Sequence, residues 1–102
     1  MPAQDKTTVL TLHPSESKQG FRIEKKKYKI IRKAILEVLE KKPRISFSEI
    51  VDYVKIYLTD NKIEFEGSLP WYVEVVKLDL EAHKLIKRFK NLKPQKYDLE
   101  HR

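Results

Sequence analysis

The chain of 102 residues contains no cysteine and only two glycines, and each shortage excludes a kind of site. Without cysteine there can be no disulfide, no thiolate metal site and no thiol nucleophile. Gly20 and Gly67 are far apart in the sequence, so no glycine-rich loop is available to hold a phosphate. His13, His83 and His101 are also far apart, and no two of them have the spacing of metal ligands. We therefore expect no enzymatic activity, cofactor, metal ion or small-molecule substrate.

Long apolar runs are absent as well. No stretch approaches the ~20 apolar residues that a membrane-spanning helix needs. The first residues lack a basic segment followed by an apolar one, so no signal peptide is expected. With 40% hydrophobic and 36% charged residues, a chain of this length should form one domain with a modest core. We expect a cytoplasmic protein that has no membrane partner.

The net charge of +7 is concentrated in two blocks of the sequence. Lysine and arginine dominate residues 22–33 and 84–96, whereas residues 45–83 carry more acids than bases. Such blocks can attract a polyanion such as DNA, although a solvated helix face and a soluble hairpin have the same composition. The candidate nucleic-acid contacts in these blocks are Lys87, Arg88, Lys90, Lys93, Lys96, Lys25 and Lys29.

Two segments in the first half of the chain have the apolar spacing of amphipathic helices. The first helix should run from about residue 24 to residue 40, because Pro43 prevents its continuation. The second should cover roughly residues 47–58. Ser46 and Glu49 precede it as a capping box, in which each side chain satisfies a free backbone N–H group of the other residue.

A third helix is predicted to follow Ser68 and to end near residues 82–83, with apolar residues on two faces. One face contains Leu69, Val73, Val76 and Leu80, and the other contains Trp71, Val75, Leu78 and Ala82. The exposed arc between the faces should consist of Glu74, Lys77 and Glu81, with Tyr72 and Asp79 on the other flank. The second face needs a cover, so we expect these residues in the core or at an interface: Trp71, Tyr72, Val75 and Leu78.

Asp79 lies at the edge of this apolar helix, where a carboxylate needs a partner. The candidates are Lys77, Arg88 and a backbone N–H group. We expect a structural contact here rather than a catalytic acid.

Strands are predicted at both ends of the chain. Residues 7–13 are β-prone and belong to an N-terminal arm and linker, residues 1–20, which precedes the main domain of residues 21–102. A short strand of this kind has to join an edge of its own domain or of a second subunit. Residues 85–89 and 96–99 predict a terminal β-hairpin, with residues 44–46 as a third strand beside it.

The predicted order of helix, short strand, helix, helix and hairpin is that of a winged helix, a mainly α fold with a small β-sheet (α+β). Residues 21–99 resemble a group of small uncharacterised bacterial proteins with a winged-helix-like pattern. The resemblance rests on Ala34-Ile35-Leu36, Gly67-Ser68, Trp71-Tyr72 and Val76-Lys77-Leu78-Asp79-Leu80-Glu81-Ala82. These proteins tend to have Arg-Gly after the alanine, where this chain has His83-Lys84. The departure predicts an unusual backbone conformation at His83 or Lys84.

Two functions are compatible with these features. The basic hairpin favours DNA binding. The acidic third helix has few side chains suited to hydrogen-bond base edges, so sequence specificity should be weak. The second apolar face of that helix favours a protein-interaction module, including a homodimer formed through this face or through the N-terminal arm. Convergence of the two lysine blocks beside the third helix would favour DNA, and separation would favour protein interaction.

Overall fold

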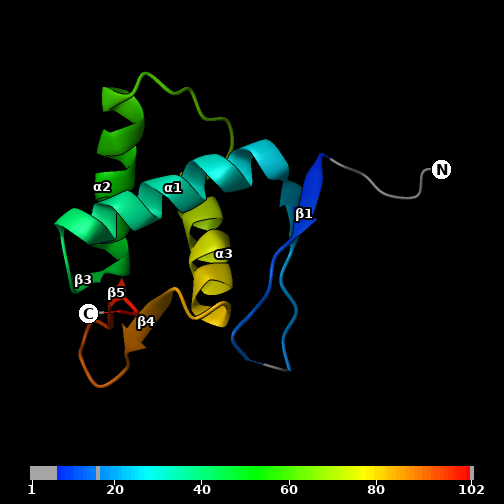
Figure 1. Cartoon of the computed structure of the whole chain (residues 1–102). Coiled ribbons are helices and arrows are strands. Elements are labelled where there is room, and N and C mark those ends of the chain that lie inside the picture. Colours follow the sequence, from blue (N-terminus) through cyan, green and yellow to red (C-terminus); the bar gives the residue numbers. More distant parts are fainter. Residues whose placement is uncertain (1–6, 16, 102) are drawn as a thin grey trace.

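Three helices form the centre of the fold, and two small antiparallel sheets lie at its edges (Figure 1). The computed structural model describes residues 7–15 and 17–101. The elements are β1 (Thr8–Leu10), β2 (Arg22–Glu24), α1 (Lys25–Lys41), β3 (Ile45–Ser46), α2 (Phe47–Asp60), α3 (Leu69–Ala82), β4 (Ile86–Phe89) and β5 (Lys96–Leu99). The expected α+β class, with three helices and a C-terminal hairpin, is confirmed.

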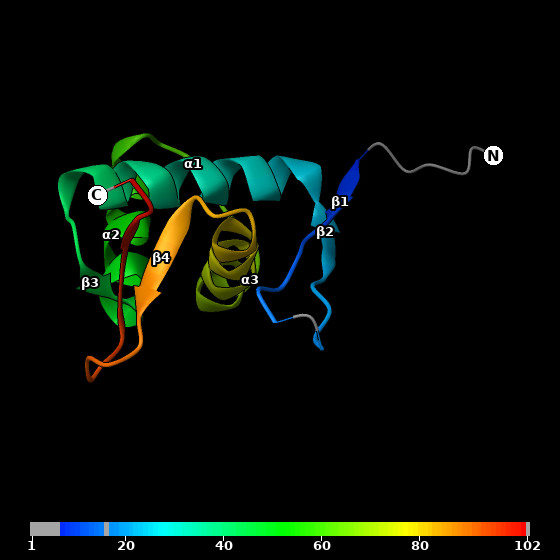
Figure 2. The same ribbon diagram turned by 60° about the horizontal axis from the view of Figure 1, so that its bottom comes forward.

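The two sheets lie on opposite sides of α3 (Figure 2). One is the ribbon of β1 and β2, in which Val9 pairs with Ile23. The other has the strand order β3-β5-β4, so the short strand before α2 pairs with the last strand of the chain. Ile45 is opposite Tyr97 in this second sheet, and Arg88 is opposite Tyr97 on its other side.

Strand β2 is absent from the sequence-based prediction, which placed no element between residue 20 and the first helix. Only three residues form β2, and its partner β1 ends 12 residues before β2 begins. So short a segment has no apolar alternation of its own, and only pairing with β1 makes it a strand. The described part of the N-terminal arm therefore joins an edge within its own chain.

The boundaries of α1 and α2 agree with the predicted ones to within two residues. The capping box before α2 is confirmed: Ser46 Oγ accepts a hydrogen bond from the Glu49 backbone N–H at 3.3 Å, and Glu49 Oε1 accepts one from the Ser46 N–H at 3.0 Å. Because both contacts are local in sequence, the pattern of residue types was sufficient to place this helix start.

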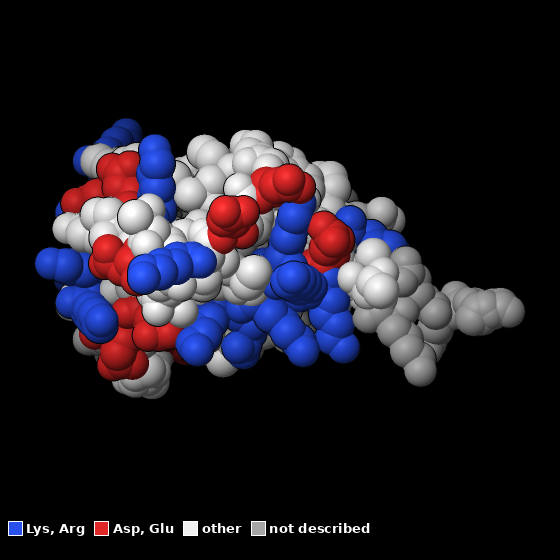
Figure 3. All heavy atoms as spheres, turned by 90° about the horizontal axis from the view of Figure 1, so that it is seen from above, with Lys and Arg blue, Asp and Glu red and all other residues white. Residues whose placement is uncertain are grey.

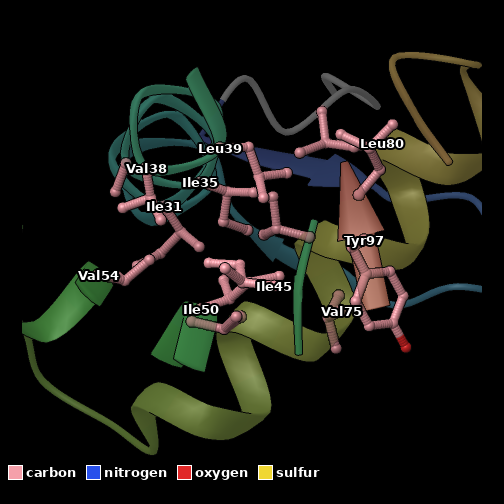
Figure 4. Close-up of a cluster of buried hydrophobic side chains, with 14 of the residues drawn as sticks. Ile31, Ile35, Val38, Leu39, Ile45, Ile50, Val54, Val75, Leu80 and Tyr97 are labelled. Atoms are coloured by element: carbon pink, nitrogen blue, oxygen red, sulfur yellow. The ribbon is translucent and has the colours of Figure 1, made fainter. Parts of the chain in front are cut away.

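The apolar core lies where the three helices meet, and each helix packs against the other two (Figure 4). Ile31 and Ile35 of α1, Ile50 of α2 and Leu80 of α3 are fully buried in it. The sheet of β3, β4 and β5 closes one end, to which it contributes buried Tyr97.

Helix α3 is buried on more than one side, as predicted, but its exposed arc was assigned wrongly. The side chain of Lys77, expected in solvent, is 1% exposed, and that of Glu81 is 9% exposed. The hairpin packs over this side of α3, and the Lys77 ammonium lies 4.3 Å from the centre of the Tyr97 ring. On the second apolar face only Val75 is fully covered, whereas Trp71 keeps 41% of its surface exposed.

Two helices are followed by a lysine in the left-handed backbone conformation, at a position where glycine is the usual residue. After α3, His83 has an ordinary φ of −85°, whereas Lys84 has a φ of 63°. The Lys84 N–H bonds to Glu81 O at 3.1 Å, and the next N–H, of Leu85, bonds to Leu80 O at 2.9 Å. This pair of contacts is the Schellman motif, which usually requires glycine. The unusual backbone predicted at this helix end is confirmed, at Lys84.

The same motif ends α2, where Lys62 has a φ of 56°. The variants Lys84→Gly and Lys62→Gly should each raise the free energy of unfolding by about 1 kcal/mol, because glycine relieves the steric cost of the left-handed conformation. Urea denaturation followed by circular dichroism measures this change. In the matched control Lys55→Gly, inside α2, the free energy should fall by about 1 kcal/mol. Destabilisation by all three variants would contradict a steric cost of the left-handed conformation at Lys84 and Lys62.

Candidate interaction surfaces around α3 and the hairpin

The hairpin of β4 and β5 has one face against the protein and one face toward solvent. Alternation along β4 places Ile86 and Arg88 on the inner face and Lys87 and Phe89 on the outer one. Lys87 is directly opposite the buried Asp98, so a carboxylate already neighbours it. The cations best placed for an external partner are therefore the exposed Lys90 and Lys93 of the turn, together with Lys96, which pairs with Phe89 on the outer face.

Arg44 adds a cation to this outer face, and it was not among the predicted site residues. It is exposed, has a φ of 56°, and places its guanidinium 4.5 Å from the centre of the Phe89 ring. Its position as the first residue of the predicted strand 44–46 was the available signal, because that strand was expected beside the hairpin. The pairing between β3 and β5 brings it there.

Arg88 faces inward and differs in this respect from the lysines of the hairpin. Its Nε and one terminal nitrogen each bond to a carboxylate oxygen of Glu81 at 2.9 Å, in a two-point contact. The hydrogen bond to Glu81 raises the pKa of Arg88 above its ordinary value. The Lys77 ammonium contacts the same carboxylate at 3.1 Å. Because Glu81 occupies its guanidinium, Arg88 is not placed to contact an external phosphate.

Lys25 and Lys29 belong to a different surface from the hairpin. Both are exposed near the start of α1, which lies beside β1 and β2. The hairpin lies near the far end of α1, since β3 follows that end and pairs with β5. A helix of 17 residues is about 25 Å long. Figures 1 and 2 show this separation, and Figure 3 shows the row of basic side chains on the side of α1. The lysine blocks therefore do not converge beside α3.

Asp79 connects α3 to the N-terminal segment and to α1. Its carboxylate is almost fully buried, at 2% exposure for the residue. Oδ1 accepts a hydrogen bond from the Leu12 backbone N–H at 2.8 Å, and Oδ2 accepts one from the Tyr28 hydroxyl at 2.5 Å. Of the three predicted kinds of partner, the backbone N–H is confirmed. His83 Nε2 also lies 3.4 Å from Oδ1.

Burial raises the pKa of the Tyr28 hydroxyl to about 12, and Asp79 adds to the shift by accepting the proton in a hydrogen bond and by opposing a second negative charge. Tyr28 is therefore neutral in the folded protein over the physiological pH range. The neutral phenol is the donor that the Asp79 carboxylate requires.

An aromatic row lies at the start of α3. Trp71 contacts Phe21 edge-to-face, with ring centres 5.3 Å apart, and contacts Tyr72 at 4.9 Å. Tyr72 in turn contacts Phe65, and the Lys27 ammonium lies over both of these rings. Phe21 remains 50% exposed, so the outer end of the row is an apolar surface. Of the predicted core or interface residues, Val75 is in the core, Tyr72 and Leu78 are half-buried, and Trp71 lies at the surface.

A groove of about 360 Å³ separates the N-terminal segment from the hairpin, with α3 as its floor. His13, Pro14, Ser15 and Lys18 line one side, Arg88 and Lys90 line the other, and Glu74, Leu78 and Glu81 line the floor. The sequence shows no sign of this groove, because its two walls are about 70 residues apart in the chain and only the fold brings them together.

Two further kinds of site have no support in the described ranges 7–15 and 17–101. No group of three or more acidic, histidine or cysteine side chains is arranged to hold a metal ion there. No helix within those ranges is both long enough and apolar enough to cross a bilayer.

Comparison with known proteins identifies a family whose function is unknown. No curated protein and no solved structure matches this chain. Residues 8–97, which include every described helix and both sheets up to β5, match one family along their whole length. The chain therefore belongs to the family of unknown function DUF6958.

Proposed function

We propose that this protein is a non-enzymatic, cytoplasmic winged-helix protein that binds the backbone of duplex DNA through its hairpin. The order α1, β3, α2, α3, β4, β5 and the strand order β3-β5-β4 support the comparison with a winged helix. The hairpin then corresponds to the wing. Fold alone does not imply binding, so the proposal depends on the chemistry of this hairpin.

The observation that carries the proposal is a cluster of cations on and beside the hairpin. These are Arg44, Lys90, Lys93 and Lys96. None of the four forms a close ion pair in the described part of the chain, although Lys96 interacts with the charge of Glu49. Contacts of lysine and arginine with phosphates release counterions from DNA, and this release provides affinity without reading bases.

Little sequence preference is expected. Recognition of bases needs polar side chains that protrude into the major groove. Along the open side of α3 the chain instead offers Trp71, Glu74 and Leu78, and Leu78 and Glu74 lie at the bottom of the groove. A phosphate backbone at the hairpin would therefore be held without base contacts from α3.

Duplex binding at several salt concentrations tests the proposal. Fluorescence anisotropy should give a log–log slope of about −3 for three or four phosphate contacts. The double variant Lys90→Gln, Lys93→Gln should flatten the slope by up to about two and weaken unrelated duplexes alike. The matched control Lys25→Gln, Lys29→Gln removes two exposed lysines from the distant end of α1, so the slope should stay the same.

No measurable binding at low salt and micromolar protein would end the DNA proposal, and so would a slope that only the control variant changes. The variant Glu74→Gln tests whether α3 approaches the DNA. Glu74 is the acid of α3 whose side chain is still open to solvent, with 46% of it exposed. Stronger binding by this variant would mean that α3 approaches the duplex, because repulsion from phosphates would be relieved.

A second function, protein interaction or homodimer formation, is favoured by the exposed apolar surface at Phe21 and Trp71. Large exposed apolar side chains that lie together mark interaction sites more often than isolated ones do. The separation of the two lysine blocks also favours this function. Sedimentation at increasing protein concentration distinguishes a homodimer from a monomer that binds another protein.

A further inference from the structure

We infer that the groove between the N-terminal segment and the hairpin binds an acidic peptide segment of a partner protein, through two apolar anchors and flanking carboxylates. The inference rests on the second proposed function, protein interaction, and it does not depend on DNA binding by the hairpin. Three features support it: fixed walls, a floor with one apolar side chain between two acids that are already paired, and cations at the rim.

Both walls of the groove are held in place by buried charges of α3. The N-terminal wall is fixed where the Leu12 N–H bonds to Asp79 at 2.8 Å. The hairpin wall is fixed where Arg88 contacts Glu81 through two bonds of 2.9 Å. A groove whose walls are already positioned loses little conformational entropy when a ligand binds.

Leu78 on the floor and Trp71 beyond the groove, on the same helix, provide two apolar side chains at a spacing that a peptide can match. Leu78 lies in the groove, and Trp71 is seven residues earlier on the same side of α3. Two helical turns separate these residues by about 10 Å. The same separation joins residues i and i+3 of an extended peptide or i and i+7 of a helix. A segment with two apolar residues at either spacing can place one on each anchor.

The charges of the groove favour an acidic ligand. Glu74 and Glu81 of the floor are already paired, since both contact the Lys77 ammonium, at 3.3 and 3.1 Å. Lys18 and Lys90 stand at the rim, one on each wall, and neither ammonium group has an ion-pair partner within the described ranges. The floor is thus neutralised internally while the rim is positive, so carboxylates that flank the apolar anchors would be complementary.

The two other possible occupants fit less well. A second copy of the chain carries the same +7 charge and would bring like charges together at the rim. A DNA duplex can meet Lys90 at the rim, but Leu78 and Glu74 on the floor offer its phosphates nothing. The remaining occupant that matches both floor and rim is a polypeptide with apolar and acidic residues.

The test uses three labelled 12-residue peptides and the full chain. The first has two leucines three residues apart among aspartates and glutamates, the second has lysine in place of each acid, and the third has serine in place of each leucine. Trp71 is the single tryptophan of the protein, so its fluorescence reports on the proposed second anchor, two helical turns from Leu78. The first peptide should change this fluorescence saturably, and the other two should bind at least about tenfold more weakly, a difference of about 1.4 kcal/mol.

Variants of the protein locate the site. Leu78→Ser and Lys18→Glu should each weaken binding of the acidic peptide at least about tenfold. The matched controls are Ile56→Ser and Lys33→Glu, which alter an exposed apolar residue and an exposed lysine outside the groove and should leave the affinity unchanged. Lys18 is exposed, so its variant keeps the test valid even if Leu78→Ser unfolds the chain.

Equal affinity of all the variants, preference for the lysine peptide, or absence of a saturable signal up to millimolar peptide would overturn the inference. Concentration-dependent dimerisation that Leu78→Ser abolishes would overturn it in favour of a second copy. The salt dependence of duplex binding by the Lys90→Gln, Lys93→Gln variant remains an independent result. Failure of the peptides together with a normal result for DNA would therefore remove this inference and leave the hairpin proposal in place.

Discussion

Replacing Glu81 by alanine is expected to lower the free energy of unfolding by about 3–5 kcal/mol, because it leaves two cations without their shared carboxylate. The side chain of Lys77 is 1% exposed and that of Arg88 is 24% exposed, so water cannot replace the lost partner fully at either group. Chemical denaturation followed by circular dichroism measures the effect.

Two further variants separate this explanation from a general loss of packing. Glu74→Ala removes the other carboxylate beside Lys77, but 46% of that side chain is exposed and Glu81 remains, so the cost should stay below about 1 kcal/mol. Lys77→Met keeps the volume of the buried chain and leaves Glu81 paired with Arg88, so its cost should also be small. Equal destabilisation by all three variants would show that the carboxylate of Glu81 is not the centre of the network.

The second large effect is expected at Asp79. Asp79→Ala leaves the Leu12 N–H and the Tyr28 hydroxyl without their acceptor, and hydrogen bonds to a charged group are worth about 1.5–3 kcal/mol each. We expect a loss of about 3 kcal/mol and faster proteolysis of the N-terminal segment, which this bond holds against α3. The matched control Asp52→Ala, at an exposed position of α2, should change stability by less than about 0.5 kcal/mol.

The alkaline side of the pH profile gives a readout specific to this contact. Tyr28 has a pKa of about 12 in the folded protein, against about 10 for an unperturbed tyrosine. Between these values the Tyr28 hydroxyl of the unfolded chain loses a proton that the folded chain keeps. The contribution of Tyr28 to the free energy of unfolding should therefore be fully present below pH 10 and should be lost as pH rises from 10 to 12. Tyr28→Phe should reduce this decline. An unchanged dependence of stability on pH in this variant would contradict a raised pKa of Tyr28 as its cause.

Removing residues 1–13 should destabilise the protein through the same site, since it deletes β1 and the Leu12 N–H. Residues 1–6 lie outside the described ranges, so the expected effect rests on residues 7–13. The core itself should survive, because the buried residues of α1, α2 and α3 come from the rest of the chain. An unchanged melting temperature and unchanged sedimentation would contradict this expectation.

Trp71 shows the limit of predicting burial from the apolar periodicity of a helix. The pattern correctly placed Val75 of the second apolar face in the core, but it could not tell that Trp71, one turn earlier, would remain 41% exposed. Val75 is 3% exposed, whereas Trp71, whose ring contacts Phe21 edge-to-face, stays open to solvent on its other side. Periodicity reports which residues share a face, and the extent of its cover depends on the neighbouring segment.

The sequence by itself determined the three helices, the capped start of α2, the hairpin and the third strand, because each of these depends on contacts within a few residues or on a repeat of apolar positions. Ser46 with Glu49 is an example in which the signal and the contact are local. Only the tertiary structure decided that Lys77 is buried, that Arg88 faces Glu81 and that Leu12 binds Asp79. These contacts join elements far apart in the chain, and a charged residue has the same appearance in a sequence whether its partner is water or a buried carboxylate.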